Sequence, residues 1–438
     1  QLYNFSNEGI TEGKDTVKEA FAEVNIPVMR DRPLVYNLEL AASGRFTHYD
    51  SYGSDFVYRL NAQYSPVEML RLRASYGTNY RAPNLYEQFV NDQSGFFGGG
   101  SDPCDSFGGL SPTDPTFINC LAELTPILDN PNTAANEALA FFNASSILVN
   151  TSGGQDNLTA ETAKSYGFGA VITLPRHIAD FSFAADYFHT TVKDEVSTLG
   201  LTILNLCYGD DPANFPNNDY CPFINGRNPL GTVYPGTIIS FQNPYLNLAQ
   251  QVVAGIDFNS RYSTPIFGGR FVAQAQATRM LEQKLEVFEG SGLFDYNGTL
   301  GYPGFGSGPK WTGSLDTRFE TGPWAFRWGV EYIGRASGED LTVPTLYPGG
   351  GESGTPGLPY TEDLVAEAYF EHGVSVQYEL RDRGQITLGV KNLFDERPPQ
   401  ISDSQDPSGQ YFRLSNFFGG GPYDYLGRSV FVNLTASF

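Results

Sequence analysis

The side chains in this sequence that are best suited to bind a ligand are aromatic and acidic residues in long segments rich in glycine, proline and asparagine. Exposed aromatic residues are depleted on inert surfaces, so a high density of them indicates a ligand site. Aromatic faces beside Asp and Asn side chains suit sugars, peptides or aryl siderophores, and the sequence does not separate these classes. The alternative is that these aromatic residues pack the loops against one another. The candidate ligand-binding residues are Tyr80, Arg81, Tyr86, Phe96, Phe97, Tyr208, Asp210, Asp211, Tyr220, Phe417, Phe418 and Tyr423.

The same long segments contain the four cysteines of the chain, in two pairs. Cys104 is paired by spacing with Cys120, and Cys207 with Cys221. Pairs without accompanying histidines make poor zinc sites, whereas an oxidising compartment favours disulfides. We therefore expect two disulfides, which would restrain long loops whose ordering is entropically costly.

No set of residues predicts catalysis, a cofactor or a resident metal. The histidines have no serine or cysteine beside them in a nucleophile and base arrangement, so we expect that the protein is not an enzyme. Residues 210–219 gather Asp and Asn oxygens that could hold calcium, but their spacing is not that of a helix–loop–helix site, and we expect no metal. The four histidines are His48, His177, His189 and His372.

Composition and charge restrict the class of protein. The formal net charge of -22 argues against a nucleic-acid partner, because phosphate binding requires a basic face. No run of about twenty apolar residues is present, which excludes a helical membrane span. The sequence begins at Gln1 without the features of a signal peptide, so we expect either a removed leader or a fragment, and we favour a fragment.

Hydrophobicity alternates with a period of two along much of the chain. In residues 429–438, Val430, Val432 and Leu434 share one parity with other apolar residues, and polar residues occupy the other parity except for Phe431. Successive side chains of a strand point to opposite faces, so this pattern predicts strands with one apolar and one polar face. The same alternation recurs in residues 56–65, 165–174, 324–332 and 366–380.

The connections between these segments differ in length in a regular way. Short turns are expected at 30–33, 65–66, 175–177, 265–268, 321–323 and 381–384. Long loops alternate with them, at about 77–160, 193–248, 290–309, 336–361 and 395–427. A soluble sandwich or propeller has no reason to separate loop lengths in this way. Short turns at one end and long extracellular loops at the other predict an all-β, antiparallel transmembrane β-barrel.

About thirteen strands are predicted, which is an odd number. Single-chain bacterial barrels have even strand numbers, and an open sheet edge is not tolerated in lipid. We therefore interpret residues 1–438 as one unit, the C-terminal part of a larger barrel. The predicted strands are 14–28, 34–47, 54–65, 68–77, 161–174, 179–192, 249–263, 269–289, 309–321, 323–335, 362–380, 384–393 and 428–438.

Three stretches resemble one family, the TonB-dependent outer-membrane receptors. Residues 72–89 contain the strand-to-loop pattern Arg-Ala-Pro-x-Leu-x-Glu. Residues 388–395 resemble the penultimate strand with its Asn-Leu-Phe-Asp ending, and residues 423–428, followed by the terminal strand, resemble the C-terminal signature. The three stretches occur in order over most of the chain, which makes the resemblance specific.

The resemblance implies a barrel of about 22 strands with an N-terminal plug inside it. This chain would lack the plug, the TonB box and about nine strands, so those parts and the TonB energy-transducing complex are expected partners. Charges of both signs on the polar parity would line water or hold the plug by weak, hydrated contacts. Those residues are Arg71, Arg73, Asp316, Arg318, Arg327, Glu331, Glu367, Glu371, Glu379 and Lys391.

The implied function is active import of a scarce solute through the outer membrane of a Gram-negative bacterium. The solute would be a small molecule or an oligomer of the siderophore, carbohydrate or peptide class, captured by the extracellular loops. Outer-membrane lipid would contact the apolar parity of the strands. The alternatives are a passive porin-like channel and a secreted adhesin or carbohydrate-binding β-protein.

Overall fold

The structure is a computed structural model of the chain. Within the residues that it describes, no helix has the length and apolar character needed to cross a membrane. The described residues are 9–129, 137–143, 145–154, 157–299, 308–337, 365–380, 384–399, 404–405, 411–412, 423–424 and 426–436.

One large antiparallel sheet forms most of the molecule. Thirteen strands follow one another in sequence order across it, apart from strands that belong to the loops, and β12 (Phe294–Asp295) adds to the end of β11. The strands are β1 (Val17–Arg32), β2 (Val35–Tyr49), β3 (Gly53–Val67), β4 (Leu70–Arg81), β7 (Glu161–Thr173), β8 (Asp180–Ser197), β10 (Leu246–Ile266), β11 (Gly269–Glu286), β13 (Trp311–Thr321), β14 (Trp324–Ile333), β17 (Tyr369–Glu379), β18 (Gly384–Lys391) and β21 (Ser429–Ala436).

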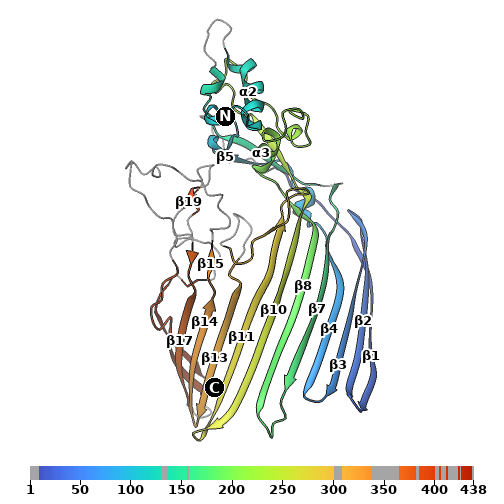
Figure 1. Cartoon of the computed structure of the whole chain (residues 1–438), viewed down its shortest axis with the longest axis vertical. Helices are drawn as coiled ribbons and strands as arrows, with labels where there is room; N and C mark the ends of the chain where they lie inside the picture. The colour runs from blue at the N-terminus through green and yellow to red at the C-terminus, as the bar shows by residue number, and fades with distance from the viewer. Residues whose placement is uncertain are drawn as a thin grey trace.

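The sheet curves, and its two ends carry connections of different length (Figure 1). At the lower end of Figure 1, strands are joined by tight turns such as those between β1 and β2 and between β13 and β14. At the upper end the chain makes its long excursions, between β4 and β7 and between β8 and β10. These described connections follow the predicted separation of short turns from long loops, and the antiparallel all-β class is confirmed. Most of the predicted turn at 381–384 and of the predicted loops at 336–361 and 395–427 lies outside the described residues.

The strand register places apolar side chains in continuous rows on one face. Residues directly opposite each other in an antiparallel pair share a face. One row crosses six strands. Four of its apolar side chains are exposed and those of Phe319 and Phe271 are partly exposed, which fits a face in contact with lipid rather than water. This row is Val432, Leu388, Val376, Phe326, Phe319 and Phe271.

The opposite face is polar and carries ion pairs. Arg73 on β4 donates two hydrogen bonds to Asp186 on β8, and Arg327 on β14 pairs with Asp316 on β13. Most of these side chains are partly exposed, so each pair contributes little to stability. This face has the composition expected of a hydrated barrel interior.

Some strands extend beyond their predicted upper ends. β4 ends at Arg81 rather than near residue 77, and β8 ends at Ser197 rather than near residue 192. The extra residues stay paired because Arg81 bridges to Glu161 at the start of β7. Tyr80 and Arg81, which were expected in a loop, therefore lie on β4.

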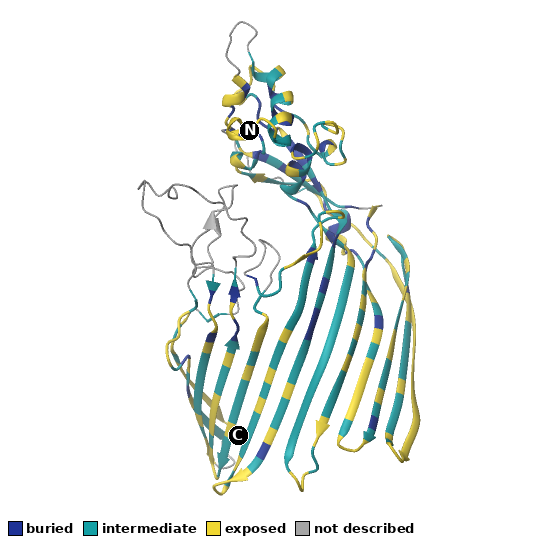
Figure 2. Ribbon diagram, in the orientation of Figure 1, coloured by how far each residue is buried: buried dark blue, intermediate teal, exposed yellow. Residues whose placement is uncertain are grey.

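The two longest loops fold together into a compact unit above the sheet, which we call the cap: residues 85–158 and 199–244. It has its own buried core, visible in Figure 2, whereas the sequence analysis placed these residues in long loops, with packing of their aromatic residues against one another as one alternative. Its core includes Phe107, Leu124, Ile203 and Phe241. Its elements are α1 (Leu85–Phe89), β5 (Gln93–Phe97), η1 (Gly99–Ser101), η2 (Phe107–Gly109), α2 (Pro115–Leu128), η3 (Glu137–Ala140), β6 (Ile147–Ser152), α3 (Thr202–Tyr208), η5 (Cys221–Phe223) and β9 (Ser240–Pro244).

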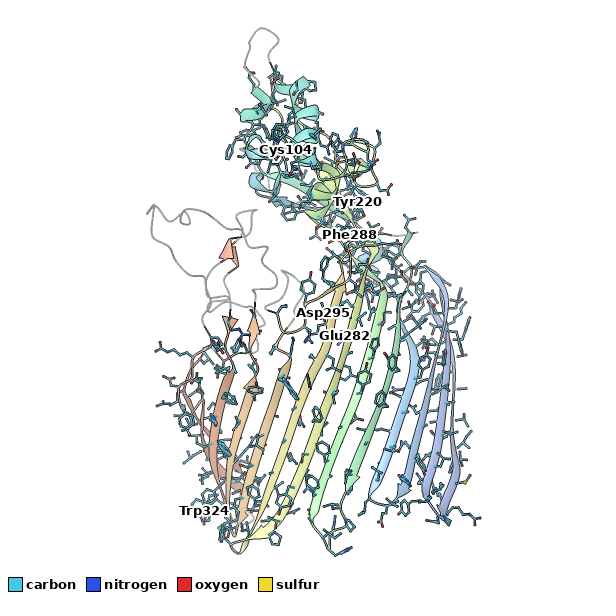
Figure 3. The ribbon with its side chains drawn as sticks, viewed as in Figure 1. Cys104, Tyr220, Glu282, Phe288, Asp295 and Trp324 are labelled. Carbon is cyan, nitrogen blue, oxygen red and sulfur yellow. A yellow bond between two sulfur atoms is a disulfide. The ribbon has the colours of Figure 1, made fainter. Side chains whose placement is uncertain are left out.

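Small sheets complete the upper end. In the cap, β6 pairs with β5 and runs parallel to β9. Tyr220 of the cap packs edge-on against Phe288, which follows β11, with ring centroids 6.3 Å apart (Figure 3). This contact ties the cap to the top of the sheet. The remaining strands are β15 (Ala336–Ser337), β16 (Val365–Ala366), β19 (Ser404–Gln405) and β20 (Tyr411–Phe412).

The two faces can be compared at adjacent alanines of β8. Ala185 lies opposite Ala170 and Phe258 on the apolar face, and Ala184 lies opposite Val171 and Asn259 on the polar face. We expect Ala185→Arg to lower the free energy of unfolding in lipid vesicles by about 2–4 kcal/mol, because it places a charge in hydrocarbon. Ala184→Arg should lower the free energy of unfolding by less than about 1 kcal/mol.

Urea titration of the complete protein in phosphatidylcholine vesicles measures both values. Equal costs at the two alanines would contradict the assignment of the faces.

Candidate ligand-binding site

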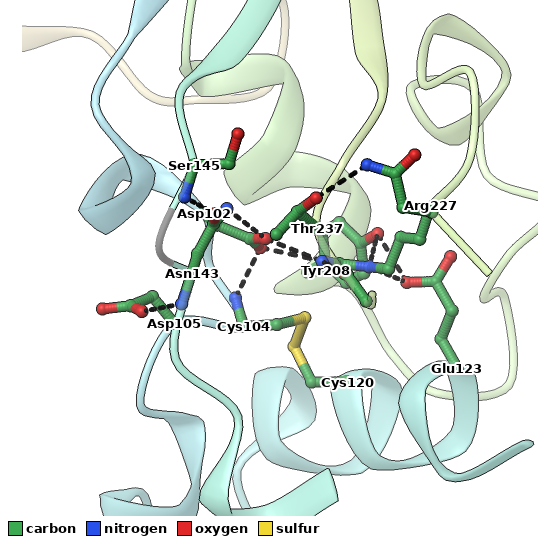
Figure 4. Close-up of polar contacts among 12 residues, drawn as sticks. Asp102, Cys104, Asp105, Cys120, Glu123, Asn143, Ser145, Tyr208, Arg227 and Thr237 are labelled. Atoms are coloured by element: carbon green, nitrogen blue, oxygen red, sulfur yellow. Dashed lines mark hydrogen bonds and ion pairs between the residues drawn. A yellow bond between two sulfur atoms is a disulfide. The ribbon is translucent and has the colours of Figure 1, made fainter. Parts of the chain in front are cut away.

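A buried arginine connects the parts of the cap (Figure 4). The side chains of Arg227 and Asp102 are fully buried. Arg227 Nη1 donates to Asp102 Oδ2 at 2.7 Å and Nη2 donates to Oδ1 at 2.9 Å, while Nε donates to Glu123 Oε2 at 2.6 Å. Paired, charge-assisted hydrogen bonds of this kind compensate for removing the charges from water. Arg227 thus joins η1, α2 and the segment that precedes β9.

Tyr208 completes this buried network. Its hydroxyl donates to Glu123 Oε2 at 2.6 Å, and its ring faces the Arg227 guanidinium at 5.0 Å. Burial raises the pKa of Tyr208 well above its ordinary value. Burial alone would lower the pKa of Arg227, but the facing Tyr208, Asp102 and Glu123 raise it overall, so this side chain stays charged.

Two disulfides hold the cap together, as the cysteine spacing predicted. Cys104 is bonded to Cys120 on α2, with Cα atoms 5.4 Å apart. Cys207 on α3 is bonded to Cys221 on η5, with Cα atoms 4.8 Å apart. Asn119 on α2 donates to the backbone carbonyl of Tyr208 at 2.9 Å, which joins the two disulfide-linked parts. The cap is therefore a cross-linked scaffold for the surfaces around it.

A cavity of about 310 Å³ lies at the upper rim, between the turn that follows β2 and helix α1. It is near the lower limit of small-molecule sites, which span roughly 300–1,000 Å³. Its walls combine apolar surface with one basic, one acidic and several neutral polar groups. The lining residues are Lys14, Asp50, Ser51, Tyr52, Pro83, Gln88, Phe89 and Leu158.

The Arg-Ala-Pro-x-Leu-x-Glu pattern builds one wall of this cavity. Asn84 caps α1 by accepting hydrogen bonds from the backbone N–H groups of Tyr86 and Glu87, and Glu87 accepts from the N–H of Asn84. Arg81 Nη1 also donates to Glu87, at 3.0 Å, and its guanidinium binds Glu161 on β7. The motif fixes the start of α1 against two strands, so Pro83, Gln88 and Phe89 face the cavity from a rigid support.

Three tyrosines gather beside the cavity. The rings of Tyr49 and Tyr52 lie 4.7 Å apart, and Tyr80 approaches both hydroxyl groups. Burial, then the proximity of Tyr80 and Tyr49, raises the pKa of Tyr52, so its hydroxyl is a neutral donor at physiological pH. We call the cavity together with Tyr49 and Tyr80 the rim site.

The predicted ligand residues fall into separate places. Tyr80 belongs to the rim site. Arg81 and Tyr86 lie on the segment that forms one of its walls, where Tyr86 packs edge-on against Tyr245 with ring centroids 6.2 Å apart. Phe97 and Tyr208 pack within the cap, and Phe96 is 45% exposed on β5. These placements show that packing the loops together accounts for part of the aromatic density.

The remaining predicted residues that the structure describes lie away from the rim site. Asp210 accepts hydrogen bonds from Asn214 and Asn218, and Asp211 accepts from the backbone of Ala213, within the loop between the second pair of cysteines. Tyr220 contacts Phe288, as described above. Tyr423 packs edge-on against Tyr369 near the other edge of the sheet. Phe417 and Phe418 lie outside the described residues.

None of the eight lining residues was among the predicted ligand-binding residues. Lys14 lies in the segment that precedes β1, and Asp50, Ser51 and Tyr52 form the turn between β2 and β3. That turn is short, and the candidate ligand residues were taken from the long loops, so its residues were not among them. The signal that could have identified it is a polar turn, Asp50-Ser51, flanked by tyrosines at positions 49 and 52.

A sheet with one apolar face, a polar ion-paired face and long loops at one end is typical of the wall of a transmembrane β-barrel. The chain belongs to the family of TonB-dependent receptor-like β-barrels, whose family model matches residues 2–393. The comparison with curated proteins gave no match.

Solved structures with the same fold are siderophore receptors. The ferric enterobactin receptor PfeA of Pseudomonas aeruginosa is 17% identical with a TM-score of 0.52, and the alignment covers 97% of this chain and 45% of PfeA. The siderophore receptor PirA of Acinetobacter baumannii is 15% identical with a TM-score of 0.56, over 97% of this chain and 46% of PirA. This chain therefore spans less than half the length of either receptor.

The role of Arg227 can be tested by its removal. We expect Arg227→Met to destabilise the cap by about 3–5 kcal/mol, because Asp102 and Glu123 lose the charge that compensates them. Hydrogen exchange of residues 99–128 and 199–241 in the complete protein measures this opening. The exposed Arg176, substituted to Met, is the control and should leave exchange unchanged. If both variants exchange like the parent protein, the network does not hold the cap.

The loop between Cys207 and Cys221 should loosen in acid. The backbone N–H of Asp211, and then the Asn218 amide, hold the pKa of Asp210 below its ordinary value of 3.8. Stability from this carboxylate is present above that value and is lost as pH falls through the lower folded pKa. We expect faster hydrogen exchange in residues 208–220 only below about pH 4.

Asp210→Asn should remove this acid step, whereas Asp219→Asn should keep it. An unchanged step in Asp210→Asn would assign the effect to another group.

Proposed function

We propose that this chain is part of the barrel of a TonB-dependent importer in the outer membrane of a Gram-negative bacterium. The observation that carries the proposal is the register-matched apolar face of thirteen antiparallel strands, combined with membership of the receptor family. Among the described strands, β1 pairs only with β2 and β21 pairs only with β18. Unpaired edges are not tolerated in lipid, so we propose that further strands close the barrel.

A plug inside this barrel is the second part of the proposal. The polar face presents ion pairs such as Arg73 with Asp186, together with glutamine, serine and asparagine side chains on neighbouring strands. Partly hydrated contacts of this kind are individually weak, which suits a domain that must move during transport. Energy from the TonB complex would move the plug.

We propose that the rim site captures the solute. It places tyrosine and phenylalanine rings beside hydrogen-bonding groups, on supports fixed by the α1 cap and by the Arg81 ion pairs. The barrel neighbours are siderophore receptors, and this supports an iron chelate as the solute class. Lys14 and Asp50 balance in charge within the cavity, and the whole chain carries -22, so a neutral chelate is favoured over a polyanion.

The rim site can be tested by binding. We expect Tyr52→Ala to weaken binding of a neutral ferric hydroxamate by about tenfold or more, because the cavity loses a ring and a buried hydroxyl donor. Tyr36→Ala, near the opposite end of β2, is the matched control and should not change affinity. Isothermal titration of the complete protein in detergent, with maltodextrin and a dipeptide as further probes, also decides the solute class. Equal binding by both variants would remove the rim site from the proposal.

Transport distinguishes the importer from a passive porin. We expect uptake of the bound probe by cells that express the complete protein to stop after deletion of TonB or after an uncoupler collapses the proton gradient. Uptake that persists under both conditions, and rises linearly with probe concentration, would favour the porin.

A further inference from the structure

The outward face of the barrel carries lysine side chains immediately above its upper level of aromatic residues. On β7 and β8, the register places Tyr166 opposite His189 and Phe168 opposite Tyr187. The rings of Tyr166 and His189 stack at 4.7 Å, and those of Phe168 and Tyr187 lie 5.0 Å apart. Aromatic rings of this kind mark the level where hydrocarbon meets the headgroups.

The next residues upward on the same face are lysines and threonines. Lys164 lies opposite Thr78 on β4 and Thr191 on β8, and Lys193 lies opposite Thr162. Lys164 and Lys193 are diagonal neighbours, with backbones about 7–8 Å apart. Both are exposed. We call Thr78, Thr162, Lys164, Thr191 and Lys193 the basic ledge.

These lysines have no acidic partner within the described part of the chain. None of the ion pairs found there includes Lys164 or Lys193. Farther along the same face, Lys284 differs, because it pairs with Glu282 at 3.2 Å. Arg279 on β11 lies on this face, stacked over Trp311 at 5.5 Å, and it also lacks an ion pair among the described residues. In a chain with 49 acidic and 27 basic residues, cations at the headgroup level that have no acidic partner among the described residues require an explanation.

The geometry points to the basic ledge as a binding site for the phosphate-bearing headgroup of an outer-leaflet glycolipid. Two ammonium groups at this spacing can contact one phosphate, and three threonine hydroxyls beside them can hydrogen-bond to sugar hydroxyls. The aromatic pairs below contact the acyl chains and the edge of the sugar. Basic residues at this level attract anionic lipids through the interfacial field.

This inference rests on the proposed location in the outer membrane. Different results would contradict the membrane location and the glycolipid-binding role of the basic ledge. A protein that does not insert into any bilayer contradicts the location, whereas a protein that inserts but does not select the glycolipid contradicts only the ledge.

Native mass spectrometry of the complete protein, released from detergent and titrated with lipid A, tests the ledge. The double variant Lys164→Gln/Lys193→Gln removes both cations, and we expect its affinity for lipid A to fall by roughly tenfold to thirtyfold. The control variant Lys284→Gln/Arg176→Gln makes the same charge change at a paired lysine and at the lower turn, and it should keep the parent affinity. Migration of unheated samples on a denaturing gel verifies that each variant forms a folded barrel.

The choice of lipid identifies the chemistry. Dephosphorylated lipid A should bind the parent protein as weakly as lipid A binds the double variant. Phosphatidylglycerol should bind less tightly than lipid A, and inorganic phosphate should not displace lipid A. Equal affinity for lipid A in parent and double variant, an equal loss in the control, equal binding of phosphatidylglycerol, or displacement by phosphate would each overturn the proposal.

Discussion

The constraint on which this structure depends is that hydrocarbon offers no hydrogen bonds to the backbone. Each strand must therefore pair on both sides, and each second side chain must be acceptable to lipid. Within the described sheet, each of the thirteen strands except the two edge strands, β1 and β21, pairs on both sides. Opposite residues share a face, so most apolar side chains gather on one face. A shift by one residue in any pair would turn charged interior residues such as Asp316 and Arg327 toward lipid.

The cap is stabilised by different interactions from the sheet, because it lies in water. Its core is small, and it depends on cross-links: two disulfides, the Asn119 contact and the buried Arg227 with its carboxylates. Buried ion pairs contribute little net stability, but they fix one arrangement, since any other leaves a charge without a partner. A rigid cap lets α1 hold its wall of the rim site in place. The barrel wall and the proposed binding surface are thus ordered by different interactions, and the two regions are joined by the ion pair of Arg81 with Glu161.

The sequence predicted the sheet well, for a physical reason. Alternation with a period of two is a local signal, and it is strong because lipid selects every second residue on each strand. The cysteine pairs were also predictable, because the partners are close in sequence. The cap fold was not predictable. Arg227 binds Asp102, which lies far away in the sequence, and no local sequence feature near either residue indicates this pairing. Likewise, the rim site combines Lys14, Tyr52 and Phe89, which come from three segments. Of these segments, only the motif that follows Arg81 was recognisable in the sequence.

The most direct test of this account is the environment of successive side chains along one strand. Nitroxide labels placed one at a time at residues 182–190 of β8, in the complete protein in vesicles, report collisions with oxygen in lipid and with a nickel complex in water. The account predicts a period of two, with labels at positions such as 183, 185 and 187 reached by oxygen and those at 182, 184 and 186 shielded from it. Accessibility that does not alternate, or oxygen contact at the even positions, would contradict it.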